Sequence, residues 1–224
     1  MSRRRLVILA ALAGLSVLVV AMVLVRERYT GSVSYSNLVW NLFLAWIPLG
    51  LAVYAHDGYR QAVGRARLWA AGALWLLFFP NALYIVTDFK WLHEWASAPI
   101  WYDIVLLSAA AWCGLLVGFA SLYLMQGIVR SAAGEVRAWA FALAALGLGA
   151  FGVYVGRFER WNSWDVFTRP GHLARALLAG LAHPQDHPRA FAVMVLFTAF
   201  LAMSYLVFYA VAAPEPSPLR RNRA

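Results

Sequence analysis

The chain has 224 residues, of which 63% are hydrophobic and 13% are charged, and its formal net charge is +9. Soluble domains are about half apolar and about a quarter charged. These proportions therefore exclude an ordinary soluble protein and predict a bilayer as the solvent for most of the chain. The basic residues flank apolar runs, which is typical of topology signals and contacts with anionic lipid rather than of nucleic-acid binding.

About six apolar runs predict membrane-spanning helices. The first covers residues 6–25, and about 20 apolar residues are what a helix needs to cross a bilayer. It follows three arginines and precedes no small-x-small cleavage site, so we interpret it as an uncleaved signal anchor. The later runs cover residues 38–55, 68–86, 100–125, 138–156 and 190–212. We expect an all-α polytopic transmembrane helix bundle in one domain over residues 1–213, followed by a disordered basic tail over residues 214–224.

The distribution of arginine and lysine predicts the orientation of the bundle. The N-terminus, the connections near residues 60 and 130, and the tail together carry more of these residues than the remaining connections. Because cytoplasmic loops are enriched in arginine and lysine, we predict that both termini are cytoplasmic. The polar residues around Asp88 and Asp103 then lie at the extracytoplasmic side. The cytoplasmic connections show no comparable cluster, and His56 and Asp57 are interpreted as ordinary loop residues.

The densest polar stretch near an apolar run is residues 78–103, which contains Asp88 and His93. Helix positions seven apart share a face, so Asn81, Tyr84 and Asp88 are expected to form one stripe on the third helix. Pro80 frees the carbonyl of residue 76, and in hydrocarbon this carbonyl needs a partner, which the Asn81 amide is expected to supply. The stripe is interpreted either as part of a polar site or as a proline kink satisfied by its neighbour.

Asp103 stands near the start of the fourth run and shares a helix face with small residues such as Gly114 and Gly118. Small residues let spanning helices pack closely, so Asp103 is predicted to point into the bundle. A carboxylate buried there needs a partner, because an isolated charge inside a membrane costs a few kcal/mol or more. The alternative is a helix start, in which Pro99 and Asp103 suit the first turn and its macrodipole. Asn41 on the second helix is expected to hydrogen-bond between helices.

A second polar motif, Gly-Arg-Phe-Glu-Arg-Trp-Asn-Ser-Trp-Asp, occupies residues 156–165. Its Arg157 and Arg160 are three residues apart, and arginine binds phosphate and carboxylate with a planar fork of donors. Each arginine alone is also explained by snorkelling at a helix end. Asn162 and Asp165 are candidates for a polar site or for a local cap.

Nothing in the sequence indicates a metal site or a cofactor. His183 and His187 are four residues apart, but Pro184 and Pro188 flank them and exclude the regular helix that a metal pair at this spacing needs. No phosphate-binding loop, nucleophile elbow or dinucleotide fingerprint occurs. The single cysteine, Cys113, lies in an apolar run and is expected to be a packing residue.

Four segments together resemble the motif set of an uncharacterised bacterial membrane family, domain of unknown function 1361. The segments are Asn-Leu-Phe-Leu-Ala-Trp-Ile-Pro at 41–48, Phe-Pro-Asn-Ala-Leu-Tyr-Ile-Val-Thr-Asp at 79–88, Trp-Tyr-Asp at 101–103, and the motif at 156–165. The resemblance covers most of the chain from the second helix onward. It implies a multi-pass protein of the bacterial cytoplasmic (inner) membrane and carries no activity with it.

We hypothesise that the polar residues form one pocket at the extracytoplasmic side that binds or processes a lipid-linked or anionic group. The acid or base candidates are Asp88, His93, Asp103 and Asp165. The ligand-binding candidates are Asn81, Tyr84, Arg157, Arg160 and Asn162. Two alternatives stay open: a small-molecule or proton-coupled transporter, and a non-catalytic structural or accessory subunit. The lipid bilayer, with its head groups, is the expected partner, and nucleic acid is not.

Overall fold

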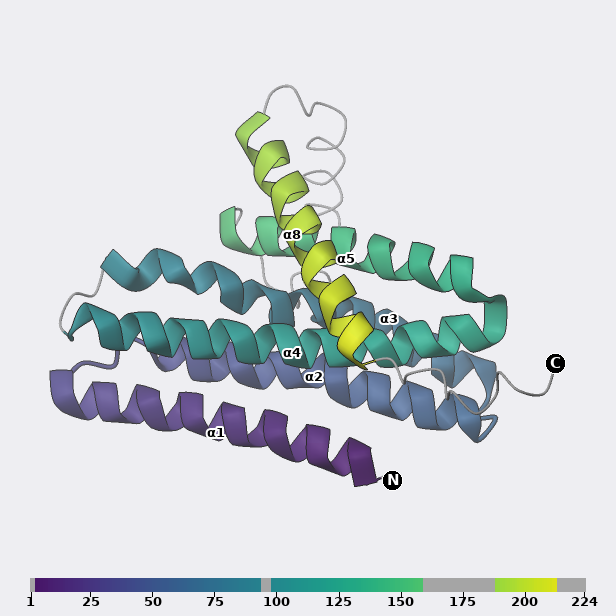
Figure 1. The fold of residues 1–224 in the computed structure, drawn as a ribbon, viewed down its shortest axis with the longest axis horizontal. Helices are drawn as coiled ribbons and strands as arrows, with labels where there is room; N and C mark the ends of the chain where they lie inside the picture. Colours follow the sequence, from purple (N-terminus) through teal and green to yellow (C-terminus); the bar gives the residue numbers. More distant parts are fainter. Residues whose placement is uncertain (1–2, 94–97, 159–187, 213–224) are drawn as a thin grey trace, which may run out of the picture.

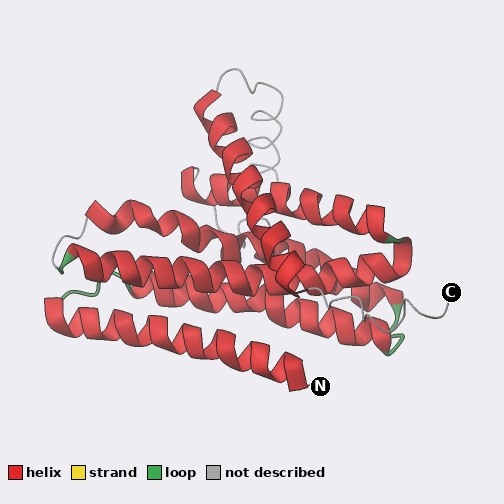
Figure 2. Cartoon of the chain, viewed as in Figure 1, coloured by secondary structure: helices red, strands yellow, loops and turns green. Residues whose placement is uncertain are grey.

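The computed structural model describes residues 3–93, 98–158 and 188–212, and the elements within these ranges are helices (Figure 2). Six of the described helices are long and apolar enough to cross a membrane. The predicted all-α bundle of about six spans is therefore confirmed. The elements are α1 (Arg3–Thr30), α2 (Ser36–Arg60), α3 (Arg65–Tyr84), the 3-10 helix η1 (Ile85–His93), α4 (Ile100–Ala133), α5 (Glu135–Phe158) and α8 (Pro188–Ala212).

Most of the helices are longer than the apolar runs that predicted them. The second helix was expected over residues 38–55, but α2 continues to Arg60 and includes His56 and Asp57. The interpretation of these two residues as loop residues is wrong, because the helix hydrogen-bond ladder extends past the end of the hydrophobic segment. In the third span, regular α-helix stops at Tyr84, and Asp88 lies in η1.

Helix α4 lies at the centre of the bundle, between α5 on one side and α1 and α2 on the other (Figure 1). Its 34 residues correspond to about 50 Å at 1.5 Å per residue, which is longer than the apolar core of a bilayer. One apolar cluster joins α4 to α3, α5 and α8, and a second joins it to α1, α2 and the end of α3. Both clusters include residues of α4, and the first also includes Ala52 and Ala55 of α2, which packs directly on α3.

Glycines let α3 approach both α4 and α5 closely. A Cβ atom on Gly114 of α4 would lie 2.6 Å from the carbonyl oxygen of Ala82, and one on Gly152 of α5 would lie 2.7 Å from Cγ of Pro80. Neither distance leaves room for a larger residue. The small-residue stripe predicted on the fourth helix is thus a packing face, and Gly149 and Gly152 of α5 form a second one against α3.

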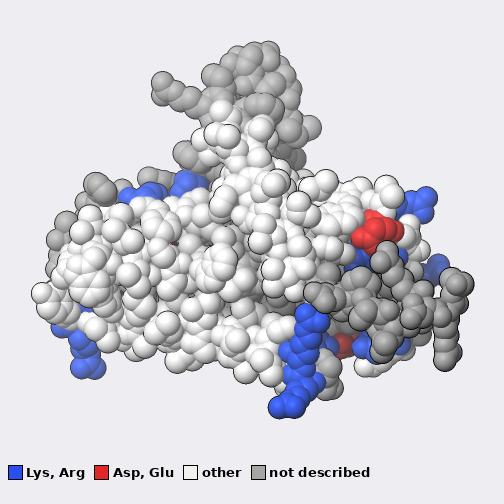
Figure 3. Space-filling view, viewed as in Figure 1, with Lys and Arg blue, Asp and Glu red and all other residues white. Residues whose placement is uncertain are grey.

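The outer surface of the bundle suits a lipid environment. In Figure 3 a broad zone without charged atoms separates the lysine, arginine, aspartate and glutamate side chains gathered toward the two ends of the long axis. Helix α8 crosses α4 and α5 obliquely (Figure 1) and exposes large apolar side chains such as Leu196 and Val207. The exposed apolar area is what hydrocarbon, rather than water, would cover.

Candidate functional site

A buried ion pair joins α1 to α4 at one end of the bundle. Arg26, near the end of α1, donates from Nε to Oδ1 of Asp103 over 2.6 Å and from Nη2 to Oδ2 over 3.0 Å. The two side chains are 0% and 2% exposed. Asp103 therefore points into the bundle and has a cationic partner, as the helix periodicity predicted. A two-pronged arginine–carboxylate pair of this kind is among the stronger ionic contacts in proteins.

Tyr35, in the connection between α1 and α2, completes this cluster. Its ring is buried, and the guanidinium carbon of Arg26 lies 4.2 Å from the ring centroid. Burial, followed by the negative charge of Asp103, raises the pKa of Tyr35 to about 12. The phenol is therefore neutral at physiological pH. Its ring makes a cation–π contact with Arg26 and adds no third charge to the cluster.

A second buried ion pair joins η1 to α5. Arg157, in the last turn of α5, donates from Nη2 to Oδ1 of Asp88 over 2.5 Å. The Asn41 amide of α2 donates to Oδ2 of the same carboxylate over 3.0 Å, which confirms the expected hydrogen bond between helices. The side chains of Arg157 and Asp88 are 7% and 4% exposed. Asp88 thus connects α2 and α5 through η1.

The Arg157 guanidinium is held by two neighbours of Asp88 as well. The Thr87 hydroxyl accepts from Nε over 2.8 Å and from Nη2 over 2.5 Å, and it donates to the carbonyl of Tyr84 over 2.6 Å. The Tyr84 ring lies against the guanidinium, with 4.1 Å between the central carbon and the ring centroid. Tyr84 and Asp88 therefore share a side of the third span, as predicted, although the backbone between them leaves α-helical geometry.

The two ion pairs belong to one polar layer, but each carboxylate has its own arginine. The negative charge of Asp88 also contributes to the raised pKa of Tyr35, so the Tyr35 phenol lies within electrostatic reach of both acids. The helix η1 also packs on α4, which carries Asp103. Arg157 contacts Asp88 and Arg26 contacts Asp103, and the single pocket that the sequence analysis proposed stays a prediction.

The other predicted site residues are distributed differently. The Asn81 amide donates to the carbonyl of Phe78 over 3.0 Å, one turn back in α3, rather than to the carbonyl of Leu76. His93 is the last residue of η1, and its side chain lies outside the described part of the chain. Three candidates, Arg160, Asn162 and Asp165, also lie outside the described residues. Their roles in binding or catalysis stay predictions.

Sequence reasoning missed Arg26, Tyr35 and Thr87. Arg26 lies two residues before the exposed Arg28 at the end of an apolar run, and the sequence does not distinguish the two arginines. The signal that points to it is the inward face of Asp103, which requires a cation from a helix ending at the same level. Among the described residues, no group of three or more His, Cys, Asp or Glu side chains is placed to hold a metal ion.

A family model described as a protein of unknown function (DUF1361) matches residues 40–204. The chain belongs to this family. No curated protein and no solved structure matches the chain. The DUF1361 match contains Asn41, Asp88, Asp103 and Arg157, whereas Arg26 and Tyr35 precede it. The ion pair between Asp88 and Arg157 is thus made entirely within the DUF1361 region, and the pair with Asp103 needs α1 as well.

Proposed function

We propose that this multi-pass membrane protein binds an anionic group, such as the phosphate of a lipid-linked molecule, at the end of the bundle that carries Arg157. The observation that supports the proposal is the arrangement of donors on Arg157. Thr87 and Asp88 occupy Nε and Nη2, whereas Nη1 makes no hydrogen bond to any residue that the structure describes. A guanidinium carries five N–H donors, so the contacts made with described residues leave Nη1 for a further oxygen.

The contacts around Arg157 fix the direction of its guanidinium, which favours a role in binding. The Tyr84 ring and the Thr87 hydroxyl hold the guanidinium independently of Asp88, so its direction does not depend on one contact. Asn41 holds the far oxygen of Asp88 and keeps this carboxylate facing Arg157. Arginine fixed in this way loses little further freedom when it binds phosphate, which favours affinity. Asp88, His93, Asp103 and Asp165 stay the predicted acid or base candidates if binding is followed by a reaction.

The test compares a polyprenyl phosphate with the corresponding neutral polyprenol on the purified full-length protein, by native mass spectrometry in detergent. We expect the phosphate to bind and the alcohol to bind much more weakly. Arg157→Gln should weaken phosphate binding about tenfold or more, since one charge-assisted hydrogen bond contributes about 1.5–3 kcal/mol. Arg28→Gln is the matched control, because Arg28 is an exposed arginine at the same end. Equal binding of phosphate and alcohol, or unchanged binding by Arg157→Gln, would refute the proposal.

The second candidate is a non-catalytic structural or accessory subunit. The pairing of Asp88 and Asp103 with separate arginines favours it, because each pair cross-links different helices. A purely structural pair tolerates the removal of both charges together. The double variant Asp88→Asn/Arg157→Gln distinguishes the two functions. Wild-type stability together with unchanged phosphate binding supports the structural role, whereas wild-type stability with lost binding supports the binding site.

A further inference from the structure

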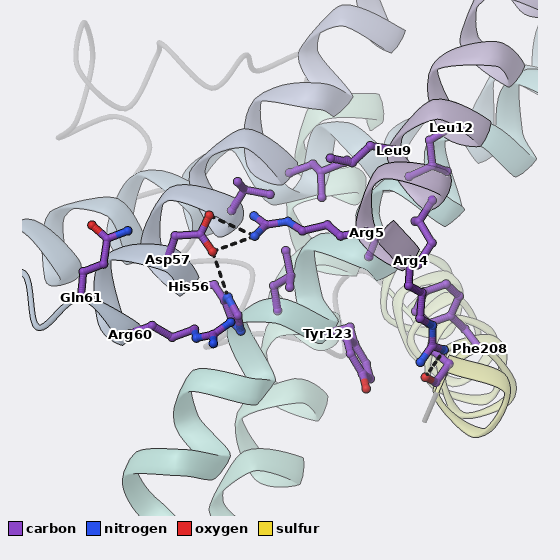
Figure 4. Close-up of a pocket in the computed structure, with 16 residues that line it drawn as sticks. Arg4, Arg5, Leu9, Leu12, His56, Asp57, Arg60, Gln61, Tyr123 and Phe208 are labelled. Carbon is purple, nitrogen blue, oxygen red and sulfur yellow. Dashed lines mark hydrogen bonds and ion pairs between the residues drawn. The ribbon is translucent and has the colours of Figure 1, made fainter. Parts of the chain in front are cut away.

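A cavity of about 840 Å³ lies at the opposite end of the bundle from the two ion pairs. The start of α1, the end of α2, the second half of α4 and the end of α8 line it (Figure 4). Arg5 lines the cavity and Arg26 lies 21 positions later on the same helix, which corresponds to about 32 Å at 1.5 Å per residue. The cavity and the polar layer around Arg157 are therefore separate sites.

More arginines than acidic residues line this cavity. The lining contains three arginines, Arg4, Arg5 and Arg60, and one acidic residue, Asp57. Nη1 of Arg5 donates to both oxygens of Asp57, over 2.7 and 3.0 Å, and the His56 ring lies 3.4 Å from the same carboxylate. This contact neutralises one of the three guanidinium groups. The cavity therefore keeps a net positive charge when His56 is neutral.

The other two arginines are not engaged by a carboxylate of any residue within 3–93, 98–158 and 188–212. Nη2 of Arg4 donates to the backbone carbonyl of Ala212, the last residue of α8, over 2.8 Å. Arg60 is exposed and makes no hydrogen bond or ion pair with any residue that the structure describes. Figure 4 shows its side chain extended alongside the His56 ring. Both charges are thus available to an incoming anion.

Apart from Gln61 and the Tyr123 hydroxyl, the remaining wall of the cavity is apolar. Leu9 and Leu12 of α1 face it from one side, Leu124 of α4 lines it, and Phe208 of α8 lies beside Arg4 (Figure 4). A site for a free anion gains nothing from such a wall, whereas an amphiphile with an anionic head and acyl chains fits both parts. Small-molecule sites span about 300–1,000 Å³, so the cavity exceeds what a single phosphate ion needs.

We propose that this cavity binds an anionic phospholipid, with the phosphate between Arg5, Arg60 and Arg4 and the acyl chains against α1, α4 and α8. The distribution of arginine predicts that this end faces the cytoplasm. Anionic lipids are concentrated in the cytoplasmic leaflet, and basic pockets between spanning helices bind their head groups. The site is independent of the anion site at Arg157.

The experiment measures lipid retention by the purified full-length protein, using native mass spectrometry with phosphatidylglycerol, phosphatidylcholine and glycerol phosphate as separate probes. We expect phosphatidylglycerol to be retained in preference to phosphatidylcholine, and glycerol phosphate not to be retained. Arg60→Gln should weaken retention about fivefold, the effect of one basic residue near an anionic surface. Arg60 makes no hydrogen bond or ion pair with a described residue, so the variant should keep the melting temperature of the wild type. Arg67→Gln, an exposed arginine of α3 outside the cavity, should retain the lipid as the wild type does.

The proposal is overturned if phosphatidylcholine is retained as well as phosphatidylglycerol. It is also overturned if Arg60→Gln and Arg67→Gln reduce phosphatidylglycerol retention equally. A third contrary result is binding of glycerol phosphate as tight as that of phosphatidylglycerol. The last result would assign the cavity to a soluble anion. The two sites are separable, because Arg157→Gln should leave phosphatidylglycerol retention unchanged and Arg60→Gln should leave polyprenyl phosphate binding unchanged. Each proposal can therefore fail without the other.

Discussion

Replacing Asp103 with asparagine leaves the Arg26 guanidinium inside the bundle without its counter-charge. The side chains are 0% and 2% exposed, so water cannot replace the lost partner. Removing one member of a buried ion pair costs about 3–5 kcal/mol. We therefore expect Asp103→Asn to lower the free energy of unfolding by about 3 kcal/mol or more.

The double variant Arg26→Met/Asp103→Leu removes both charges. It shows whether the loss of stability in Asp103→Asn comes from an unpaired buried arginine or from the loss of the ion pair itself. Apolar residues of similar volume often replace a buried ion pair without loss of stability. The double variant should therefore be more stable than Asp103→Asn. The assay is reversible unfolding in mixed detergent, followed by tryptophan fluorescence. If Asp103→Asn unfolds within about 1 kcal/mol of the wild type, or the double variant is no more stable than the single one, the pair is not the buried contact described above.

Two further predictions concern packing and orientation. Gly114→Ala should destabilise the bundle by about 1–3 kcal/mol, because its new Cβ would meet the Ala82 backbone. Gly50→Ala, with no atom within 4 Å of its new Cβ, should not destabilise it in the same unfolding assay, and equal destabilisation by both variants would contradict the close approach of α3 and α4. In intact cells or oriented vesicles, cysteines placed at Gln61 and Lys90 should react with a membrane-impermeant reagent from opposite faces, with the cytoplasmic face at Gln61. The buried native Cys113 should stay unlabelled, and labelling of both sites from one face would refute the predicted topology.

The burial of Arg26 and Arg157 affects how the orientation is inferred. Both directly follow predicted apolar runs at the side that the distribution of arginine and lysine assigns to the exterior. Each is instead fixed by a carboxylate inside the bundle, so neither acts as a freely exposed topology signal. Arg5 is also paired, with Asp57, at the predicted cytoplasmic end. The distribution of the remaining arginine and lysine residues along the sequence still favours cytoplasmic termini.

Local sequence patterns determined the spanning helices and the inward direction of Asp103. Hydropathy predicts spanning helices well because the backbone N–H and C=O groups of a segment in the bilayer must be hydrogen-bonded within the protein. A helix pairs them with residues a few positions away in the same segment. The face of Asp103 follows from periodicity along a single helix. The end of α3 was less predictable, because the 3-10 geometry of η1 breaks that periodicity beyond Tyr84.

Only the tertiary structure decided which arginine contacts which carboxylate. From the sequence alone, Arg26 and Arg28 are alike, yet Arg26 is buried against Asp103 and Arg28 is exposed. The choice depends on which helix ends become neighbours, and close packing around glycines of α4 and α5 sets those neighbours. The cavity lined by Arg5 and Arg60 likewise requires the ends of four helices to meet. Charge pairing acts over a few ångströms in space between residues far apart in the chain, so no local pattern could specify it.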